Sequence, residues 1–158
     1  MQKPNQSVLT LWTAFINEHP AYAKTPVPDY FFFCDNEQDA NTCAELVTKK
    51  IKQATAPSVW WYEYHNAPMP NVGDLFIVTN WDGVAKAVIE LTNIQQVPFN
   101  KVDAAFAQAE GEGDKSLAYW RKAHKAYYHR EMEAAGASFN KNMLISCERF
   151  RTIFVSGQ

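Results

Sequence analysis

A lysine and a threonine three residues apart, Lys52 and Thr55, are the side chains of this sequence best placed to do chemistry together. They follow a stretch with helical periodicity, so the amine and the hydroxyl meet at a helix end. Further along the chain, the segment 109–114 alternates acidic residues with glycine in the order Ala-Glu-Gly-Glu-Gly-Asp. A lysine, a threonine and a carboxylate in one pocket can hydrolyse an amide, or can hold a nucleobase without reacting with it.

Composition limits the kinds of ligand to expect. The chain has 158 residues, of which 47% are hydrophobic and 20% are charged, as in a soluble globular protein with one core. Its net charge is −2, whereas proteins that bind a long nucleic-acid backbone usually carry a basic surplus. This balance favours a small or short ligand over an extended polynucleotide.

The cysteines and the chain ends indicate a cellular compartment. Cys34, Cys43 and Cys147 show no Cys-x-x-Cys spacing, so neither a disulfide framework nor a zinc site is indicated. No apolar run approaches the roughly 20 residues that span a bilayer, and the first seven residues lack an apolar signal core. We expect a cytoplasmic protein without cofactor or metal, since His124 and His129 are five apart and point in different directions on a helix.

Helical periodicity indicates the elements that precede and carry Lys52. A first amphipathic helix is expected to begin after Ser7 as N-cap and to stop at Pro20. The aromatic run 30–33 is typical of a short strand. Asp35 or Asn36 then caps a second helix, whose apolar face extends to residue 51.

The rest of the chain combines strands with helices. The runs 75–78 and 84–91 flank Asp82-Gly83, which predicts a hairpin, and 143–154 reads as a closing strand. Helices are expected over 101–109 and over 115–135, the latter capped by Asp114 and closed by Gly136. The segment from Pro57 to Trp61 fits a short helix or a strand. This succession predicts an α+β fold with a mixed or antiparallel sheet, strongly curled or closed into a small barrel.

Several side chains have two readings. Aromatic residues make up 14% of the chain and most must be core, but Trp60 and Trp61 are candidates to stack on a base, with Asn80 and Trp81 behind them. Lys52 and Thr55, taken singly, fit a solvated helix end and a backbone-bonding hydroxyl. Two more groups are read as solvated: the acids Glu110 and Asp114, and a basic stripe of Arg121, Lys122, Lys125 and His129, which is also where polymeric RNA would bind.

Four elements in this order resemble the ASCH domain family (activating signal cointegrator homology). They are Lys52-x-x-Thr55, the Val-Gly-Asp at 72–74, the acidic loop 109–112, and a closing strand through Cys147-Glu148. The segments 34–41 and 112–121 resemble the larger, stand-alone bacterial subgroup of that family. The resemblance covers about residues 8–155.

The resemblance implies a PUA-like fold, which is a small curled β-barrel flanked by helices, as a single domain over 1–158. Residues 1–35 are then an N-terminal helical extension packed on it. Some small members are amidohydrolases that remove the acetyl group of N4-acetylcytidine with a lysine, a threonine and a glutamate. By motif position these are Lys52, Thr55 and Glu112. The family often has glycine and arginine where this chain has Lys50 and Pro57.

The function that the resemblance implies is hydrolysis of an amide in an acylated or modified nucleoside such as N4-acetylcytidine. The expected ligand is then a small nucleoside or short RNA, and nothing indicates specificity for DNA. In this reading Thr55 attacks the acyl carbon while Lys52 takes its proton, or Glu112 activates water while Thr55 holds the substrate. Two alternatives stay open. One is a non-catalytic RNA-binding PUA-like module, and the other is a ribonuclease acting on single-stranded RNA, as reported for at least one larger member.

Overall fold

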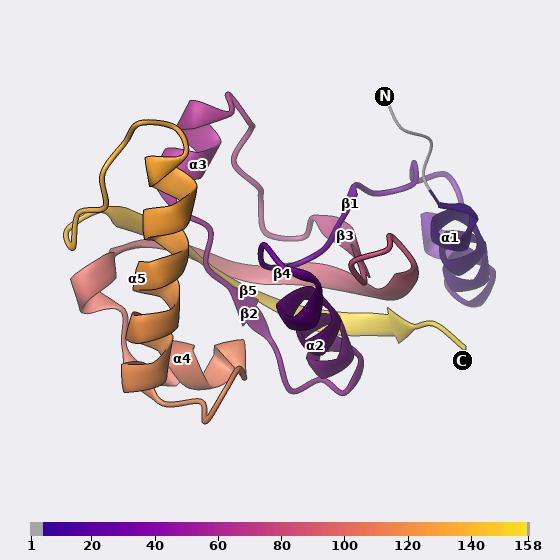
Figure 1. The fold of residues 1–158 in the computed structure, drawn as a ribbon. Helices are drawn as coiled ribbons and strands as arrows, with labels where there is room; N and C mark the ends of the chain where they lie inside the picture. Colours follow the sequence, from indigo (N-terminus) through magenta and orange to yellow (C-terminus); the bar gives the residue numbers. More distant parts are fainter. Residues whose placement is uncertain (1–4, 158) are drawn as a thin grey trace. The chain divides into compact units, whose positions relative to one another are not determined.

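The structure, a computed structural model, describes residues 5–157, and these form two compact units (Figure 1). The first unit comprises residues up to 50 together with 73–90 and 151 onward, and the second comprises 51–72 and 91–150. The single domain expected over 1–158, with 1–35 as an extension, stays a prediction. Its first four residues lie outside the described part.

The first unit contains α1 (Gln6–Glu18), η1 (Pro20–Tyr22), β1 (Tyr30–Phe31), α2 (Glu37–Thr48) and β3 (Leu75–Thr79). The second contains β2 (Ala54–Thr55), α3 (Val59–Tyr64), η2 (Phe99–Lys101), α4 (Ala104–Glu110) and α5 (Leu117–Glu133). The long strands β4 (Ala85–Pro98) and β5 (Leu144–Val155) contribute residues to both units.

The described strands form one mixed sheet in the order β1-β3-β4-β5-β2. β1 runs parallel to β3, whereas β3–β4 and β2–β5 are antiparallel, so the predicted α+β class with a mixed sheet is confirmed. The sheet is open, with β1 and β2 as its edges, and the predicted barrel is not confirmed. Closing a barrel requires the two edge strands to pair with each other. Here each edge strand has two residues and a partner on one side.

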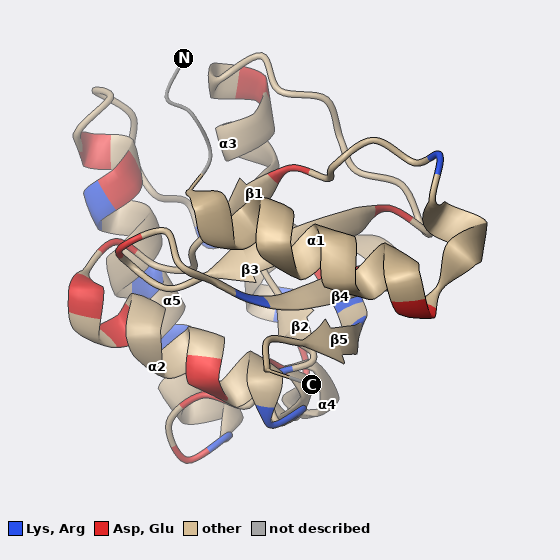
Figure 2. Ribbon diagram, turned by 90° about the vertical axis from the view of Figure 1, so that its right-hand side faces the viewer, with Lys and Arg blue, Asp and Glu red and all other residues tan. Residues whose placement is uncertain are grey.

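Helix α1 covers the core of the first unit as the sequence predicts, but it begins two residues earlier. Asn5 is the N-cap, because its side chain accepts a hydrogen bond from the Ser7 N–H at 2.9 Å. Ser7 lies inside the helix instead, where its hydroxyl accepts from the Ala85 N–H. The apolar side of the helix packs on β3, β4 and β5 through Val8, Leu11, Trp12, Phe15, Ile77, Ala85, Val88 and Phe154. Figure 2 shows that α1 carries almost no charge along its length.

The second helix and the hairpin also follow their sequence signals. Asn36 caps α2 by accepting from the Asp39 N–H. The helix ends at Thr48, so Ile51 lies beyond it and is exposed rather than part of its apolar face. β3 and β4 pair through the predicted hairpin, whose turn contains Gly83 with a φ of +82°.

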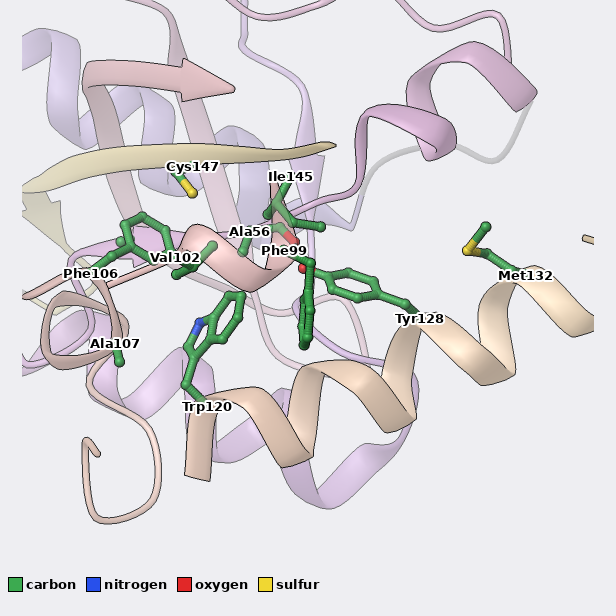
Figure 3. Close-up of a cluster of buried hydrophobic side chains, with 11 residues drawn as sticks. Ala56, Phe99, Val102, Phe106, Ala107, Trp120, Tyr128, Met132, Ile145 and Cys147 are labelled. Atoms are coloured by element: carbon green, nitrogen blue, oxygen red, sulfur yellow. Dashed lines mark hydrogen bonds between the residues drawn. The ribbon is translucent and has the colours of Figure 1, made fainter. Parts of the chain in front are cut away.

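In the second unit three helices surround a buried aromatic core. α3 is a helix with Ser58 as N-cap, which settles the ambiguous segment after Pro57. α5 is capped by Ser116 and not by Asp114, because Asp114 is exposed and accepts from the Ser116 N–H instead. Figure 3 shows Trp120 and Tyr128 extending from α5 towards Phe99 and the strand residues above it.

The described residues contain no helix that is both long enough and apolar enough to cross a membrane.

Candidate functional site

Lys52 is buried in the second unit, with only 1% of its surface exposed, and does not sit on a solvated helix end. Its Nζ donates to the Ala54 carbonyl at 2.7 Å, to Glu110 Oε2 at 2.5 Å and to Glu112 Oε2 at 3.0 Å. Three acceptors match the three N–H groups of an ammonium, whereas a neutral amine has one fewer donor. The two carboxylates also favour the charged form. The geometry therefore favours Lys52 as a cation over Lys52 as a base.

A glycine between the two carboxylates lets both reach the same ammonium. Helix α4 ends at Glu110, and Gly111 follows in the left-handed conformation with a φ of +72°. A Cβ atom at this position would lie 2.5 Å from the Ile51 carbonyl oxygen, closer than real contacts allow. The Gln53 N–H donates to the Ala109 carbonyl at 2.7 Å and joins the same two segments. Only a glycine fits this close backbone approach without displacing it.

His124 on α5 completes the group. Its Nε2 lies 3.4 Å from Glu110 Oε1, and its Nδ1 lies 2.9 Å from the Trp120 carbonyl oxygen. Because a carbonyl oxygen only accepts, Nδ1 carries a hydrogen, whereas Nε2 and Glu110 Oε1 form an ion-pair contact without a hydrogen bond. Burial disfavours the charged ring, but attraction by Glu110 and then Glu112 outweighs it and raises the pKa of His124. We call Lys52, Glu110, Glu112 and His124 the Lys52 cluster.

The two carboxylates of the Lys52 cluster differ in their affinity for protons. Burial alone would raise the pKa of Glu110, but the charges of Lys52 and His124 hold it well below its usual range. Burial raises the pKa of Glu112, and the neighbouring Glu110 charge adds to this against the attraction of Lys52. The Glu112 side chain is 21% exposed and that of Glu110 only 2%. Glu110 is thus a fixed counter-ion, and Glu112 is the carboxylate that can exchange a proton with a ligand.

The same side chains bear on metal binding. One ligand atom each of Glu110, Glu112 and His124 lie within 4.8 Å of one another. The Lys52 ammonium already takes the place of a cation between the two carboxylates. A metal ion could bind here only by displacing that ammonium, and His124 would have to give up the proton on Nε2.

Thr55 lies three residues after Lys52, in β2. It is half-buried and pairs with Glu148 of β5. Lys50, in the place of the family's glycine, has a φ of +61°, so this position keeps the conformation that glycine adopts most easily. The catalytic roles expected for Lys52, Thr55 and Glu112 stay predictions, as does the joint action of Thr55 with the other two.

The four side chains expected to bind substrate fall into both units. Trp60 and Trp61 lie half-buried in α3, where Trp60 stacks on Tyr64 and also packs against the aromatic core. Asn80 and Trp81 lie in the β3–β4 turn of the first unit, and Asn80 Oδ1 accepts from the Val84 N–H there. Their roles in binding stay predictions.

Two members of the Lys52 cluster were not expected from the sequence. Glu110, read as a solvated acid, is one of the most buried side chains, because its partner Lys52 lies 58 positions away in the chain. For His124 the sequence indicates only that a metal shared with His129 is improbable. Its spacing of four from both Trp120 and Tyr128 could have placed it on the inner face of α5, since all three share one side of a helix.

The model of one known protein family covers most of this chain. Residues 29–154 match the model of the ASCH domain. The chain belongs to the ASCH domain family. No curated protein matches it.

Two solved structures of this fold are similar over nearly the whole chain. The structure of an ASCH domain from Lactobacillus crispatus has 34% sequence identity and a TM-score of 0.88, and the match covers 96% of this chain and 97% of that one. A protein from Enterococcus faecalis has 28% identity and a TM-score of 0.87, with 95% and 90% covered. The ASCH resemblance expected from the sequence is confirmed.

Proposed function

We propose that this ASCH domain hydrolyses an amide bond of an acylated or otherwise modified nucleoside, such as N4-acetylcytidine. The observation that carries the proposal is the buried Lys52 ammonium held between two carboxylates, of which Glu112 alone is partly open to solvent. Strongly perturbed titratable groups that cluster around one point are characteristic of reaction sites. The lysine and glutamate match those of the amidohydrolases that the chain resembles.

The contacts of Lys52 favour one of the two routes considered. Glu112 takes a proton from a water molecule, and the water oxygen forms a bond to the acyl carbon. The positive charge of Lys52 stabilises the negative charge that develops on the carbonyl oxygen. Glu112 then gives its proton to the amide nitrogen as the C–N bond breaks. The products are cytidine and acetic acid, which ionises to acetate by releasing its proton to solvent, and Thr55 holds the acyl group during these steps.

The test is release of cytidine from N4-acetylcytidine, followed by chromatography. We expect Glu112→Gln to lower kcat by about 100-fold or more, because the amide cannot take the proton. The matched control is Asp114→Asn, which changes an exposed carboxylate in the same loop and should leave the rate unchanged. Wild-type protein that is inert on this nucleoside and on other N-acylated nucleosides would remove the proposal.

A non-catalytic RNA-binding module is the second candidate, since α5 carries exposed basic residues that include Arg121, Lys122 and Lys125. Binding to phosphates through such a stripe must weaken steeply as salt rises. A gel shift with short single-stranded RNA at several salt concentrations separates the candidates. Tight, salt-sensitive binding that is lost on changing Lys122 and Lys125 to Gln, in a protein without hydrolase activity, supports this second function. Cleavage of the RNA in the same assay supports the ribonuclease alternative.

A further inference from the structure

A second buried carboxylate, Glu148, lies in the second unit outside the Lys52 cluster. It belongs to β5 and is only 5% exposed. The Tyr62 hydroxyl donates to Glu148 Oε2 at 2.8 Å, and the Ser146 hydroxyl donates to the same oxygen at 2.7 Å. Both donors therefore reach one oxygen, which leaves the other oxygen for a different partner.

Within the part of the chain that the structure describes, no cation compensates this carboxylate. Among the described residues Glu148 takes part in no ion pair, and its surroundings act on it through burial and the two hydroxyls alone. Burial raises the pKa of Glu148, and the hydrogen bonds from Ser146 and Tyr62 lower it only in part. An uncompensated buried charge is costly, so a group of this kind is expected where it serves a ligand.

The second oxygen of Glu148, Oε1, is not fully enclosed by the protein. No hydrogen bond of the described residues uses Oε1. In the described part of the chain, the fully buried polar side-chain atoms that lack a hydrogen-bond partner are Glu110 Oε1 and Trp120 Nε1. Glu148 Oε1 also lacks such a partner but is not among them, so it retains some accessible surface. Glu148 Oε1 is therefore within reach of solvent.

Strand pairing places Glu148 beside Thr55. The two residues face each other across β2 and β5, and the pairing continues on both sides through the Phe150 N–H to Gln53 and the Ser146 N–H to Pro57. Directly opposed residues of antiparallel strands have Cβ atoms about 5 Å apart on one face of the sheet. Residues of alternate parity on these strands belong to the aromatic core instead: Ala54, Ala56, Ile145 and Cys147.

The Lys52 cluster contacts β2 through the backbone of the strand. The Lys52 ammonium bonds to the carbonyl of Ala54, the residue that precedes Thr55. A nucleoside whose acyl group lies at Thr55 would therefore have the base that carries this group next to Glu148.

We propose that Glu148 is a specificity residue that binds the N–H edge of a cytosine-like base, with Oε1 as the acceptor and Tyr62 and Ser146 fixing the carboxylate. The proposal rests on the proposed function for the position of the acyl group at Thr55. Carboxylates accept well from the exocyclic amine of cytosine, whereas uracil presents an oxygen at that place, which a carboxylate repels.

The test is equilibrium binding of cytidine and of uridine to the whole protein by titration calorimetry near pH 8. We expect wild-type protein to bind cytidine about tenfold or more tightly than uridine. In Glu148→Gln, the amide oxygen takes the hydrogen bonds of Tyr62 and Ser146 and the NH2 group faces the ligand. The preference should then fall to about onefold or invert, since NH2 complements the oxygen of uridine.

The matched control is Glu63→Gln, the same chemical change at an exposed carboxylate of α3. It should keep the cytidine preference within about threefold of wild type, because an exposed side chain outside the proposed site contributes little to binding there. A loss as large as that of Glu148→Gln would show a structural effect and overturn the inference. So would equal binding of both nucleosides, or binding of neither, by wild-type protein.

These outcomes separate the two proposals. A Glu148-dependent preference for cytidine in a protein without amide hydrolysis supports this inference and contradicts the proposed function. If wild-type protein hydrolyses the amide but Glu148→Gln keeps the wild-type preference for cytidine, the proposed function is supported and this inference is contradicted.

Discussion

Replacing Glu110 by Gln tests whether the Lys52 cluster is a true buried ion-pair network. The Lys52 and Glu110 side chains are each 2% exposed, with Nζ 2.5 Å from Oε2. At an effective dielectric constant of about 20, two charges at that distance attract by about 7 kcal/mol before the cost of removing them from water. Measured losses on removing one partner of a buried pair are about 3–5 kcal/mol, because the remaining charge stays buried.

We therefore expect Glu110→Gln to lower the free energy of unfolding by about 3–5 kcal/mol. For a chain of this length that corresponds to a fall in Tm of about 6–20 °C. Thermal and urea unfolding, followed by circular dichroism at neutral pH, measure both quantities. Asp114→Asn in the same loop is the control, with an expected change below about 0.5 kcal/mol because this side chain is exposed.

A double variant distinguishes charge from shape. Lys52→Met together with Glu110→Gln removes both charges, so its loss of stability should be smaller than the sum of the two single losses. Strictly additive losses would refute the reasoning, as would a Glu110→Gln protein within about 1 kcal/mol of wild type.

Three further predictions concern other parts of the chain. The pKa of His124 is raised above the value of about 6.5 in an unfolded chain, so its stabilising charge is fully present below that pH and is lost as pH rises through the folded pKa. Above pH 6.5, the free energy of unfolding measured with urea should thus fall more steeply with rising pH in wild type than in His124→Gln. The difference in slope should correspond to about one bound proton at most. Lys50→Gly should raise the free energy of unfolding by about 0.5–1 kcal/mol, because the left-handed φ of +61° strains lysine but not glycine. Cys34 and Cys43 have their sulfurs 3.7 Å apart, so hydrogen peroxide should oxidise them to a disulfide with loss of two hydrogens and formation of water. Mass spectrometry should find this in wild type and not in Cys34→Ser, with Cys147 left as a thiol because burial raises its pKa to about 12.

Local periodicity predicted helices α2, α4 and α5, but not the two-residue strand β2 that carries Thr55. The expected apolar face of α2 was borne out at Ala40, Cys43, Ala44 and Val47, but not at Ile51, which lies beyond the helix and is exposed. The Asp82-Gly83 signal placed the hairpin correctly, because its glycine adopts the positive φ that such turns need. Helix caps were less certain, since Asn5 and Ser7, or Asp114 and Ser116, can each cap a helix and differ only in backbone geometry.

Contacts between distant segments could not be predicted in the same way. An acidic residue next to a glycine reads as solvated unless its cation is known, and the cation of Glu110 lies in a different part of the sequence. The place of Cys34 beside Cys43 depends on the turn before α2, where Cys34 has a φ of +68°. The sequence likewise could not show that β1 and β2 are open edges of the sheet, because strand propensity does not reveal which strands lack a second neighbour.

The backbone approach at Gly111 has a consequence for protein design. Transplanting the paired carboxylates into another scaffold requires three conditions at once: a helix that stops at the first acid, a residue without a side chain, and a neighbouring strand entry whose carbonyl comes this near. An alanine there would push the two chain segments apart and separate the acids from their lysine. Searches for comparable proteins should therefore look for Glu-Gly-Glu after a short helix rather than for acidic residues in general.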